Sequence, residues 1–324
     1  MTNLLLNNNI EILNTFEELV ESPVKRVKGI HSPIRWFGGK HYLAKDIISL
    51  LPEHHCYVEP FCGGGHVLTQ KEPSKVEVYN DIDGDLINFL LTLRNSKEKL
   101  LSALETLPTS RFLAKMWANQ PLPEDPFERA VRWYWLLRHL IVPANNPDAR
   151  SGFRTGKIKS VAFDYQNSVV RLKQFEQRLR NVNIEMLDFK ECIRKYDSPN
   201  TVFFVDPPYI GREGMYKGGF TEKTHRELAE LLRSIKGKAL VTYYPDPLID
   251  EIYAGWRRHE KEAYVGTVAR GEGHRKKKET ELFLMNYDEN YNKINFEQHL
   301  TVQPKFESNL FDFGTEEETQ LSFF

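Results

Sequence analysis

An apolar stretch that ends abruptly at two prolines constrains the fold of this chain more than any other feature. The run Thr201–Val205 is followed at once by Asp206-Pro207-Pro208-Tyr209. A strand that is apolar on both faces is typical of the middle of a parallel sheet, where helices cover each side. Proline lacks the N–H that a central strand needs, so the strand has to stop there. In an open α/β sheet the carboxyl end of a strand faces the ligand crevice, which places Asp206 at a candidate site.

A glycine loop upstream fits the same architecture. The predicted strand Cys56–Glu59 runs into the loop Pro60-Phe61-Cys62-Gly63-Gly64-Gly65, and the next predicted strand is Lys75–Tyr79. No Lys-Ser or Lys-Thr follows Gly65, so the loop is not a P-loop. This order, a strand, a glycine loop, a helix, a second strand and then an acid, is the βαβ order found in one half of a nucleotide-cofactor-binding fold.

Acidic residues follow the second of these strands. Asp81 stands where such half-folds bind ribose hydroxyls, and we expect it to do so here. Asp83 and Asp85 compete for that role, although acids at a helix N-terminus would also explain them.

The remaining pattern predicts an α/β fold, a doubly wound sheet with a mainly helical insertion between its second and third recognisable strands. We expect a leader with a short helix around Ile10–Val20 and then a helix over Tyr42–Leu51. Later elements are expected near Ile184, at Lys223–Ile235, at Ala239–Tyr243 and at Leu282–Tyr287. The predicted organisation is a leader at 1–30, a catalytic domain at 31–85 and 183–290, a target-recognition insertion at 86–182, and an acidic, aromatic tail at 291–324.

The Asp-Pro-Pro-Tyr segment suits chemistry on an exocyclic ring amine. The N6 lone pair of adenine is delocalised into the ring, so the amine is a poor nucleophile. Asp206 and the carbonyl of Pro207, whose φ is fixed, can each accept one N6 hydrogen and favour a pyramidal nitrogen. Tyr209 offers a ring on which an extruded base could stack. The same logic would serve cytosine N4, which we keep as an alternative.

Upstream of the first strand lies Ile34-Arg35-Trp36-Phe37-Gly38-Gly39-Lys40. Lys40 could pair with a cofactor carboxylate, and an aromatic ring here could face a sulfonium cation. A packed Trp-Phe pair beside a surface lysine is the structural alternative.

In this order, Trp36–Lys40, Glu59–Gly65, Asp81 and Asp206–Tyr209 resemble the motifs of the Dam-type family of N6-adenine DNA methyltransferases. Met186–Phe189 and the basic segment Arg270–Glu279 resemble further parts of that family. The resemblance implies a Rossmann-like methyltransferase sheet with a helical target-recognition insertion, and a cofactor, S-adenosyl-L-methionine. The catalytic residues would be Asp206, Pro207, Pro208 and Tyr209. The cofactor-binding residues would be Trp36, Lys40, Glu59, Pro60, Phe61, Gly63, Gly65, Asp81, Asp188, Phe189 and Asp206.

The expected substrate is double-stranded DNA. The formal net charge is only −1, but basic residues cluster in two segments, which are either DNA contacts or solvated loops. The insertion departs from the family pattern, so no target sequence is carried over. The predicted DNA-binding residues are Arg138, Asn145, Asn146, Arg150, Arg154, Lys157, Arg275, Lys276 and Lys277. A catalytically silent DNA-binding protein on this fold is the non-enzymatic alternative.

Nothing in the sequence predicts a metal site or a membrane segment. Cys56, Cys62 and Cys192 lack ligand spacing, as do the four histidines at 54, 55, 66 and 225. No apolar run is long enough to cross a bilayer. We therefore expect a cytoplasmic protein of a bacterial, phage-infected or mobile-element host cell.

The C-terminus has its own signal. Three consecutive acids, Glu316–Glu318, precede Gln320-Leu321-Ser322-Phe323-Phe324, which resembles the short motif that docks bacterial proteins into the replication sliding clamp. Alternatively these aromatics pack back on the domain or do nothing. A restriction endonuclease is a further candidate partner.

Overall fold

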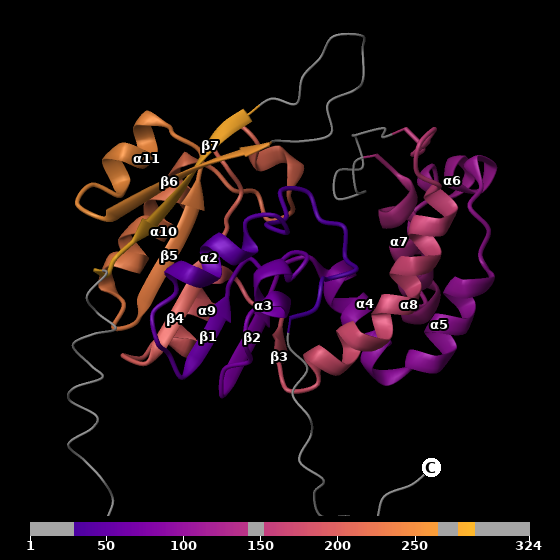
Figure 1. Cartoon of the computed structure of the whole chain (residues 1–324), viewed down its shortest axis with the longest axis horizontal. Coiled ribbons are helices and arrows are strands. Elements are labelled where there is room, and N and C mark those ends of the chain that lie inside the picture. The colour runs from indigo at the N-terminus through magenta and orange to yellow at the C-terminus, as the bar shows by residue number, and fades with distance from the viewer. Residues whose placement is uncertain (1–28, 142–151, 265–277, 289–324) are drawn as a thin grey trace, which may run out of the picture. The chain divides into compact units, whose positions relative to one another are not determined.

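The computed structural model describes residues 29–141, 152–264 and 278–288, and Figure 1 traces their course. Its strands are β1 (Cys56–Glu59), β2 (Val76–Asn80), β3 (Asn183–Glu185), β4 (Thr201–Val205), β5 (Lys238–Tyr243), β6 (Arg257–Tyr264) and β7 (Lys278–Met285). Its helices are α2 (Ala44–Leu50), α3 (His66–Gln70), α4 (Gly84–Asn95), α5 (Lys97–Thr106), α6 (Arg111–Ala118), α7 (Pro126–His139), α8 (Val161–Leu179), α9 (Phe189–Tyr196), η1 (Glu213–Met215), α10 (Glu222–Ser234) and α11 (Pro247–Ile252). The predicted helix around Ile10–Val20 and the tail lie outside the described residues.

The strands form one sheet in the order β3-β2-β1-β4-β5-β7-β6. The first five pair in parallel, whereas β7 runs antiparallel to both β5 and β6. The predicted α/β class and the predicted strands β1 and β4 are confirmed. The strand β6 was not predicted, because its sequence, Arg257-Arg-His-Glu-Lys-Glu-Ala-Tyr264, is mostly charged and resembles a solvated loop.

The core explains why β4 is apolar throughout. Val202 and Phe204 pack into the cluster on one face of the sheet, and Phe203 and Val205 into the cluster on the other face. Helices α9, α10 and α11 supply the second cluster. Because successive side chains of a strand point to opposite faces, a strand covered on both sides favours apolar residues, here Val202 to Val205, and a buried polar residue such as Thr201 needs a hydrogen-bond partner.

The strand order reverses between β1 and β4, which are parallel neighbours. At such a switch point the connections leave the sheet on opposite sides, and a crevice opens at the carboxyl ends of the strands. Here these ends carry Glu59 and Asp206. The topology therefore brings together two motifs that are far apart in the chain.

The predicted helical insertion is present between β2 and β3. Helices α4 to α8 lie together beyond the β3 edge of the sheet (Figure 1). Phe89 of α4 stacks on Tyr134 of α7 with ring centres 4.8 Å apart. Core residues of the insertion belong to the same cluster as Tyr57 and Tyr79 of the sheet. The insertion is thus packed against the catalytic part, and the predicted domain limits stay a prediction.

A buried ion cluster joins α8 to β2. Arg178 donates two hydrogen bonds to the Glu77 carboxylate, at 2.6 and 2.9 Å, and a third to the Leu68 carbonyl at 2.6 Å. Lys71 donates to the same carboxylate at 2.7 Å. Burial opposes the charge of Glu77, but the hydrogen bonds from Arg178 and the charge of Lys71 outweigh it and lower the pKa of Glu77.

None of the helices that the structure describes combines the length and the apolar character needed to cross a bilayer.

We predict that Arg178→Met lowers the free energy of unfolding by about 3–5 kcal/mol, because it leaves a buried carboxylate without its bidentate partner. Arg180→Met is the matched control: Arg180 is half-exposed and pairs with Glu176 on its own helix, so its loss should cost under about 1 kcal/mol. Urea unfolding of both variants measures this, and equal losses would contradict the prediction.

Candidate active site

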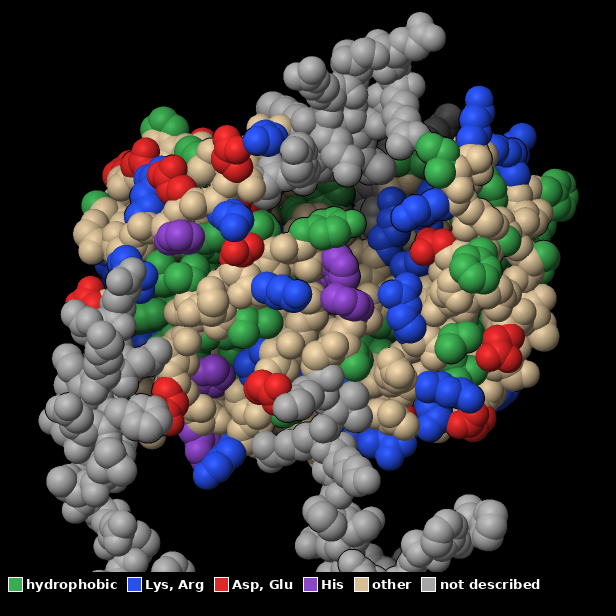
Figure 2. Space-filling model, viewed as in Figure 1, with side chains coloured by type: hydrophobic (Ala, Val, Ile, Leu, Met, Phe, Trp, Pro, Cys, Tyr) green, Lys and Arg blue, Asp and Glu red, His purple; other side chains and the backbone are tan. Residues whose placement is uncertain are grey.

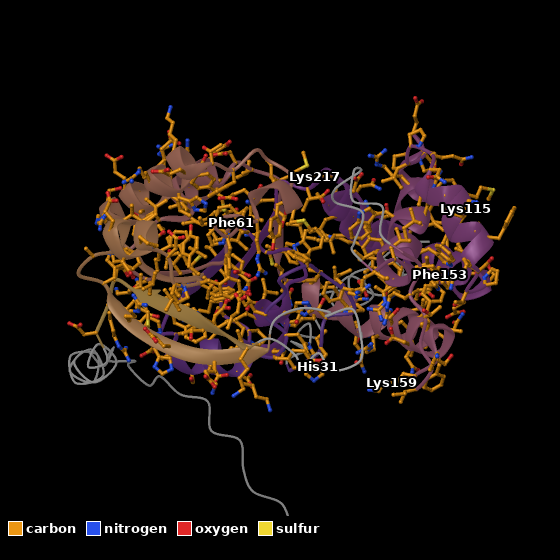
Figure 3. The ribbon with its side chains drawn as sticks, turned by 90° about the horizontal axis from the view of Figure 1, so that it is seen from above. His31, Phe61, Lys115, Phe153, Lys159 and Lys217 are labelled. Atoms are coloured by element: carbon orange, nitrogen blue, oxygen red, sulfur yellow. The ribbon has the colours of Figure 1, made fainter. Side chains whose placement is uncertain are left out.

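A pocket lies at the carboxyl ends of β1, β2 and β4, where the strand order reverses. Two of its lining residues, Phe61 and Lys217, are labelled in Figure 3. The predicted residues that line it are Trp36, Lys40, Glu59, Phe61, Gly63, Asp81, Asp206 and Pro208. The other lining residues are Phe37, Gly39, Cys62, Gly64, His66, Val67, Ile82, Asp83, Phe204, Tyr216 and Lys217.

The glycine loop is fixed by its neighbours rather than free. Gly63 and Gly65 have φ of 51° and 63°, in the left-handed region that favours glycine. A Cβ at Gly63 would lie 2.4 Å from Trp36 Nε1. The Gly63 amide donates to Asp81 Oδ2 at 2.7 Å, so the loop is tied to the acid at the end of the next strand.

Asp81 and Asp83 both line the pocket but make different contacts. Asp81 Oδ1 accepts the Asp83 amide at 2.9 Å, and burial raises the pKa of Asp81 to about 6. Asp83 caps α4 by accepting a hydrogen bond from the Asp85 amide at 3.0 Å. This agrees with the alternative explanation that the acid serves the helix N-terminus. Within the described residues, its buried Oδ2 has no hydrogen-bond partner. The turn therefore still holds an unsatisfied acceptor.

Glu59 ends β1 with its side chain inside the protein. It is 2% exposed and accepts hydrogen bonds from Tyr57 Oη at 2.8 Å and Cys62 Sγ at 3.1 Å. Burial raises the pKa of Glu59 to about 7. The carboxyl therefore loses its proton near neutral pH, and a cation brought beside it would favour the ionised form.

Lys40 links the segment before α2 to the end of β4. Its Nζ lies 2.7 Å from Asp206 Oδ1 and 3.4 Å from Glu281 Oε1, and donates to the Gly38 carbonyl at 2.9 Å. Burial disfavours the ammonium, but the two carboxylates outweigh this and raise the pKa of Lys40. The residue is not at the surface, and its contact with a cofactor carboxylate stays a prediction.

Asp206 is held through one of its two oxygens. Thr242 Oγ1 donates to Oδ1 at 2.8 Å, the same oxygen that Lys40 contacts. Among the residues that the structure describes, none donates to Oδ2 or to the carbonyl of Pro207. The carboxylate is thus fixed in place with one oxygen still able to accept hydrogen bonds.

Tyr209 is less open than its predicted stacking role suggests. It is 7% exposed, and its hydroxyl donates to Glu281. Its ring meets that of Tyr244 edge-on at 4.6 Å. Tyr244 is partly exposed, with the Arg212 guanidinium 5.0 Å from its ring centre. Stacking of a base on Tyr209 stays a prediction, and Tyr244 is an aromatic neighbour that the sequence did not single out.

The segment after Tyr209 returns to the acidic turn. Lys217 Nζ lies 2.6 Å from both Asp83 Oδ1 and Asp85 Oδ2. Tyr216 Oη donates to the Phe37 carbonyl at 3.4 Å. Both residues line the pocket and were missed, because nothing local in the sequence shows that this segment folds back over β2.

Some predicted cofactor residues lie outside the pocket lining. Phe189 packs against Phe61 with ring centres 5.4 Å apart, so it supports a lining residue. Asp188 is exposed and caps α9 by accepting the Lys190 amide at 2.9 Å. Two further predicted cofactor residues, Pro60 and Gly65, and two predicted catalytic residues, Pro207 and Tyr209, also lie outside the pocket lining. The buried Asn80, which was not predicted, donates to the carbonyls of both Pro60 and Leu187, at 2.9 and 3.0 Å.

His66 is the one pocket histidine, in the described part of the chain, that the sequence left without a role. A Cβ at Gly39 or Gly64 would come within 2.8 Å of its ring. Burial lowers the pKa of His66 to about 3, so the ring is neutral. Within the described residues, no three His, Cys, Asp or Glu side chains are grouped to hold a metal ion.

Arg138 and Arg154 gather around Asp164. Arg138 is 6% exposed and donates to the Pro33 carbonyl at 3.1 Å and to Asp164 at 2.9 Å. Arg154 donates to the Arg138 carbonyl at 2.8 Å and to Asp164 at 3.0 Å. Arg35, which was not predicted, donates to the carbonyls of Leu140 and Ile141 at 2.5 and 2.8 Å.

These contacts involve the described backbone at Arg138, Leu140 and Ile141, and the side chain of Arg154, on either side of residues 142–151. Figure 2 shows Lys and Arg side chains gathered between the sheet and the helical insertion. Burial lowers the pKa of Arg35 to about 10, with Arg154 and Arg138 adding repulsion. Lys157 is exposed. The other predicted DNA-binding residues lie outside the described residues: Asn145, Asn146, Arg150, Arg275, Lys276 and Lys277.

Comparison with known proteins points to one family. A family model described as D12 class N6 adenine-specific DNA methyltransferase matches residues 36–267. The type II methyltransferase M1.LlaDCHI of Lactococcus lactis subsp. cremoris is 25% identical over 276 residues, which cover 78% of this chain and 94% of that protein. The DNA adenine methylase of Escherichia coli (strain K12) is 25% identical over 215 residues, which cover 62% of this chain and 75% of that protein.

A phage protein is also similar. The DNA N-6-adenine-methyltransferase of Escherichia phage P1 is 28% identical over 238 residues, covering 68% of this chain but only 31% of that longer protein. These matches confirm the predicted resemblance and the methyltransferase fold. They favour adenine over the cytosine alternative.

We predict that stability falls as pH rises from about 4.5 to 8 and that Glu59→Gln reduces this fall. A carboxyl whose pKa is raised by folding stabilises the protein below its unfolded pKa, and that contribution is lost as pH rises through the folded value, about 7. The loss from Glu59 is on the order of 2–3 kcal/mol. Urea unfolding at several pH values tests this, with the exposed Glu230→Gln as control. Parallel curves for Glu59→Gln and the wild type would contradict it.

Proposed function

Because the chain belongs to the D12 class of N6 adenine-specific DNA methyltransferases, we propose that its pocket binds S-adenosyl-L-methionine and that Asp206 and Pro207 orient the adenine amine beside it. The enzyme methylates DNA at adenine N6. When bound, S-adenosyl-L-methionine supplies a methyl group attached to a sulfonium centre. The chain's own residues bind both partners and orient them.

The residues of the pocket fit that cofactor. Asp81 and the unsatisfied Oδ2 of Asp83 are acceptors suited to ribose hydroxyls. Glu59, whose ionised form gains from a nearby cation, suits the amino group. Phe61, supported by Phe189, offers an apolar ring on which the adenine of the cofactor can lie. Gly63 lets the backbone pass where a side chain would strike Trp36.

The observation that carries the proposal is the arrangement of Asp206 at the switch point. Lys40 and Thr242 occupy Oδ1, while Oδ2 and the Pro207 carbonyl have no described donor. Two acceptors that start from adjacent residues match the two hydrogens of one exocyclic amine. Both follow β4 directly, and Asp206 lines the same pocket as the glycine loop.

These acceptors act on the electronic state of the amine. Hydrogen bonds to both N6 hydrogens favour a pyramidal nitrogen and return its lone pair from the ring, so the nitrogen becomes a better nucleophile. Methyl transfer leaves N6 positively charged, and the negative charge of Asp206 stabilises this cation as it forms. The positively charged nitrogen then loses a proton, and no strong base is needed to remove it.

The target adenine has to leave the DNA stack, because N6 of a paired base cannot reach a pocket inside the protein. We assign contact with duplex DNA to the segment 142–151, which lies outside the described residues, and to Arg154, which is partly exposed. Arg138 is buried in hydrogen bonds, so we assign it to the support of this segment. Guanidinium groups suit both phosphates and guanine edges.

We predict that Asp206→Ala abolishes methylation, with a loss of at least about 100-fold, because the amine loses an acceptor and its charge stabilisation together. The wild type and the variant would be expressed in a methylation-free bacterial host and modified bases mapped genome-wide. Wild-type cells should carry N6-methyladenine in one short motif. Asp250→Ala, on the exposed end of α11, is the matched control and should keep the modification.

Two outcomes would count against the proposal. Residual N6-methyladenine with Asp206→Ala would remove this residue from the site, and methylcytosine in wild-type cells would change the substrate. If neither protein modifies DNA although both bind S-adenosyl-L-methionine by calorimetry, the chain is the silent binder that the sequence left open.

We further propose that the protein acts in the cytoplasm of a bacterial, phage-infected or mobile-element host cell. A restriction endonuclease partner is supported only by the name of the lactococcal relative, a type II methyltransferase. Docking to the replication sliding clamp through Gln320–Phe324 is supported only by the sequence of that segment, which lies outside the described residues.

The clamp proposal predicts that purified clamp and the intact chain co-elute in size-exclusion chromatography, because the five residues fill a preformed groove. A chain that lacks residues 320–324 should elute separately. If the intact chain also elutes separately, the proposal fails.

A further inference from the structure

Glu281 places a carboxylate on a face of its strand that is otherwise apolar. It belongs to β7, and alternate residues Phe283 and Met285 pack into the hydrophobic cluster on one face of the sheet. The period of a strand places Glu281 on the same face. The residue is 3% exposed. A buried carboxylate costs free energy unless it has partners, so its contacts indicate what it is for.

Glu281 contacts Tyr209 and Lys40, and Lys40 in turn contacts Asp206. Its carboxylate accepts a hydrogen bond from the Tyr209 hydroxyl, and its Oε1 lies 3.4 Å from Lys40 Nζ. Lys40 in turn lies 2.7 Å from Asp206 Oδ1. Its ammonium is also 4.8 Å from the centre of the Tyr209 ring. Glu281 therefore reaches Asp206 through Lys40.

The hydrogen-bonding capacity of Lys40 makes this geometry specific. An ammonium has three N–H donors. Here it has three acceptors within reach: the Gly38 carbonyl, Asp206 Oδ1 and Glu281 Oε1. Without the charge of Glu281, the third N–H is free to turn toward the other oxygen of Asp206. That oxygen is the one the proposed function leaves for adenine N6.

The charges support the same conclusion. Two carboxylates share one ammonium, so this buried group carries a net negative charge of about one. Removing the charge of Glu281 would leave Lys40 and Asp206 as a neutral pair. A neutral pair stabilises a cation formed at N6 less than a negative group does.

We propose that Glu281 is a positioning residue, which draws the Lys40 ammonium away from Asp206 Oδ2 and fixes Tyr209, so that Asp206 keeps one free oxygen and its charge for the adenine amine. This inference rests on the proposed function. It adds a residue from β7, far along the chain from the Asp-Pro-Pro-Tyr motif.

The test is Glu281→Gln in the full chain, measured with tritiated S-adenosyl-L-methionine and DNA from a methylation-free host. The amide has the same size and can still accept from Tyr209, but it lacks the charge. We expect kcat to fall about 10- to 100-fold while KM for S-adenosyl-L-methionine changes less than about twofold. Binding of S-adenosylhomocysteine, measured by calorimetry, should be unchanged. Glu260→Gln, an exposed change on the neighbouring strand β6, is the matched control and should leave kcat unchanged.

Two further variants separate positioning from a general loss of packing. Glu281→Asp keeps the charge and should recover part of kcat. In a Lys40→Met background, Glu281→Gln should cost little more, because its effect passes through Lys40. The inference is overturned if Glu281→Gln keeps kcat within about twofold, if Glu281→Asp is no better than Glu281→Gln, or if the two losses add. Full activity of Asp206→Ala would instead overturn the proposed function.

Discussion

The ammonium of Lys40 is the interaction on which the arrangement of the site depends. It lies between Asp206 and Glu281, and so joins the segment before α2, the end of β4 and the strand β7. Without this cation, the buried carboxylate of Glu281 and the partly exposed one of Asp206 would lack their shared counter-charge, which would cost free energy of folding. The ion pair also explains why Asp206 presents one oxygen rather than two, since Oδ1 is already occupied by Lys40 and Thr242. The position of one side chain thus affects both the stability of the pocket and which oxygen of Asp206 is left without a described donor.

The sequence could predict the parts of the site that depend on local rules. Two prolines after an apolar run end a central strand wherever they occur, and glycines after β1 allow the turn that brings Gly63 to Asp81. The sequence could not show which distant side chains meet. Glu281 follows the basic segment Arg270–Glu279, and nothing near it in the sequence indicates its partner Lys40, which lies 241 positions earlier in the chain. Strand β6 was missed for a related reason: its charged residues are exposed at the sheet edge, where no apolar alternation is required.

One short segment serves both the pocket and the helical insertion. Trp36 and Lys40 line the pocket, while the adjacent Arg35 holds the carbonyls of Leu140 and Ile141 at the start of the segment 142–151. Arg154 donates hydrogen bonds to the Arg138 carbonyl and to Asp164. The segment that lines the pocket is thus joined to the helical insertion through Arg35, by two hydrogen bonds.

Acidic and basic side chains are concentrated in different parts of the structure: acids at the pocket, and arginines around Asp164. Five acids line the pocket or lie directly behind it: Glu59, Asp81, Asp83, Asp206 and Glu281. Two cations, Lys40 and Lys217, lie among them. Such a region favours a cationic methyl donor and accepts a neutral base, but it repels phosphate. The guanidinium groups that suit phosphate gather instead around Asp164, between the sheet and the insertion. The polyanionic backbone of DNA is therefore attracted beside the pocket and excluded from it. Extrusion of the base is compatible with both charge distributions. The phosphates stay beside the basic groups, and only the uncharged adenine enters the acidic pocket.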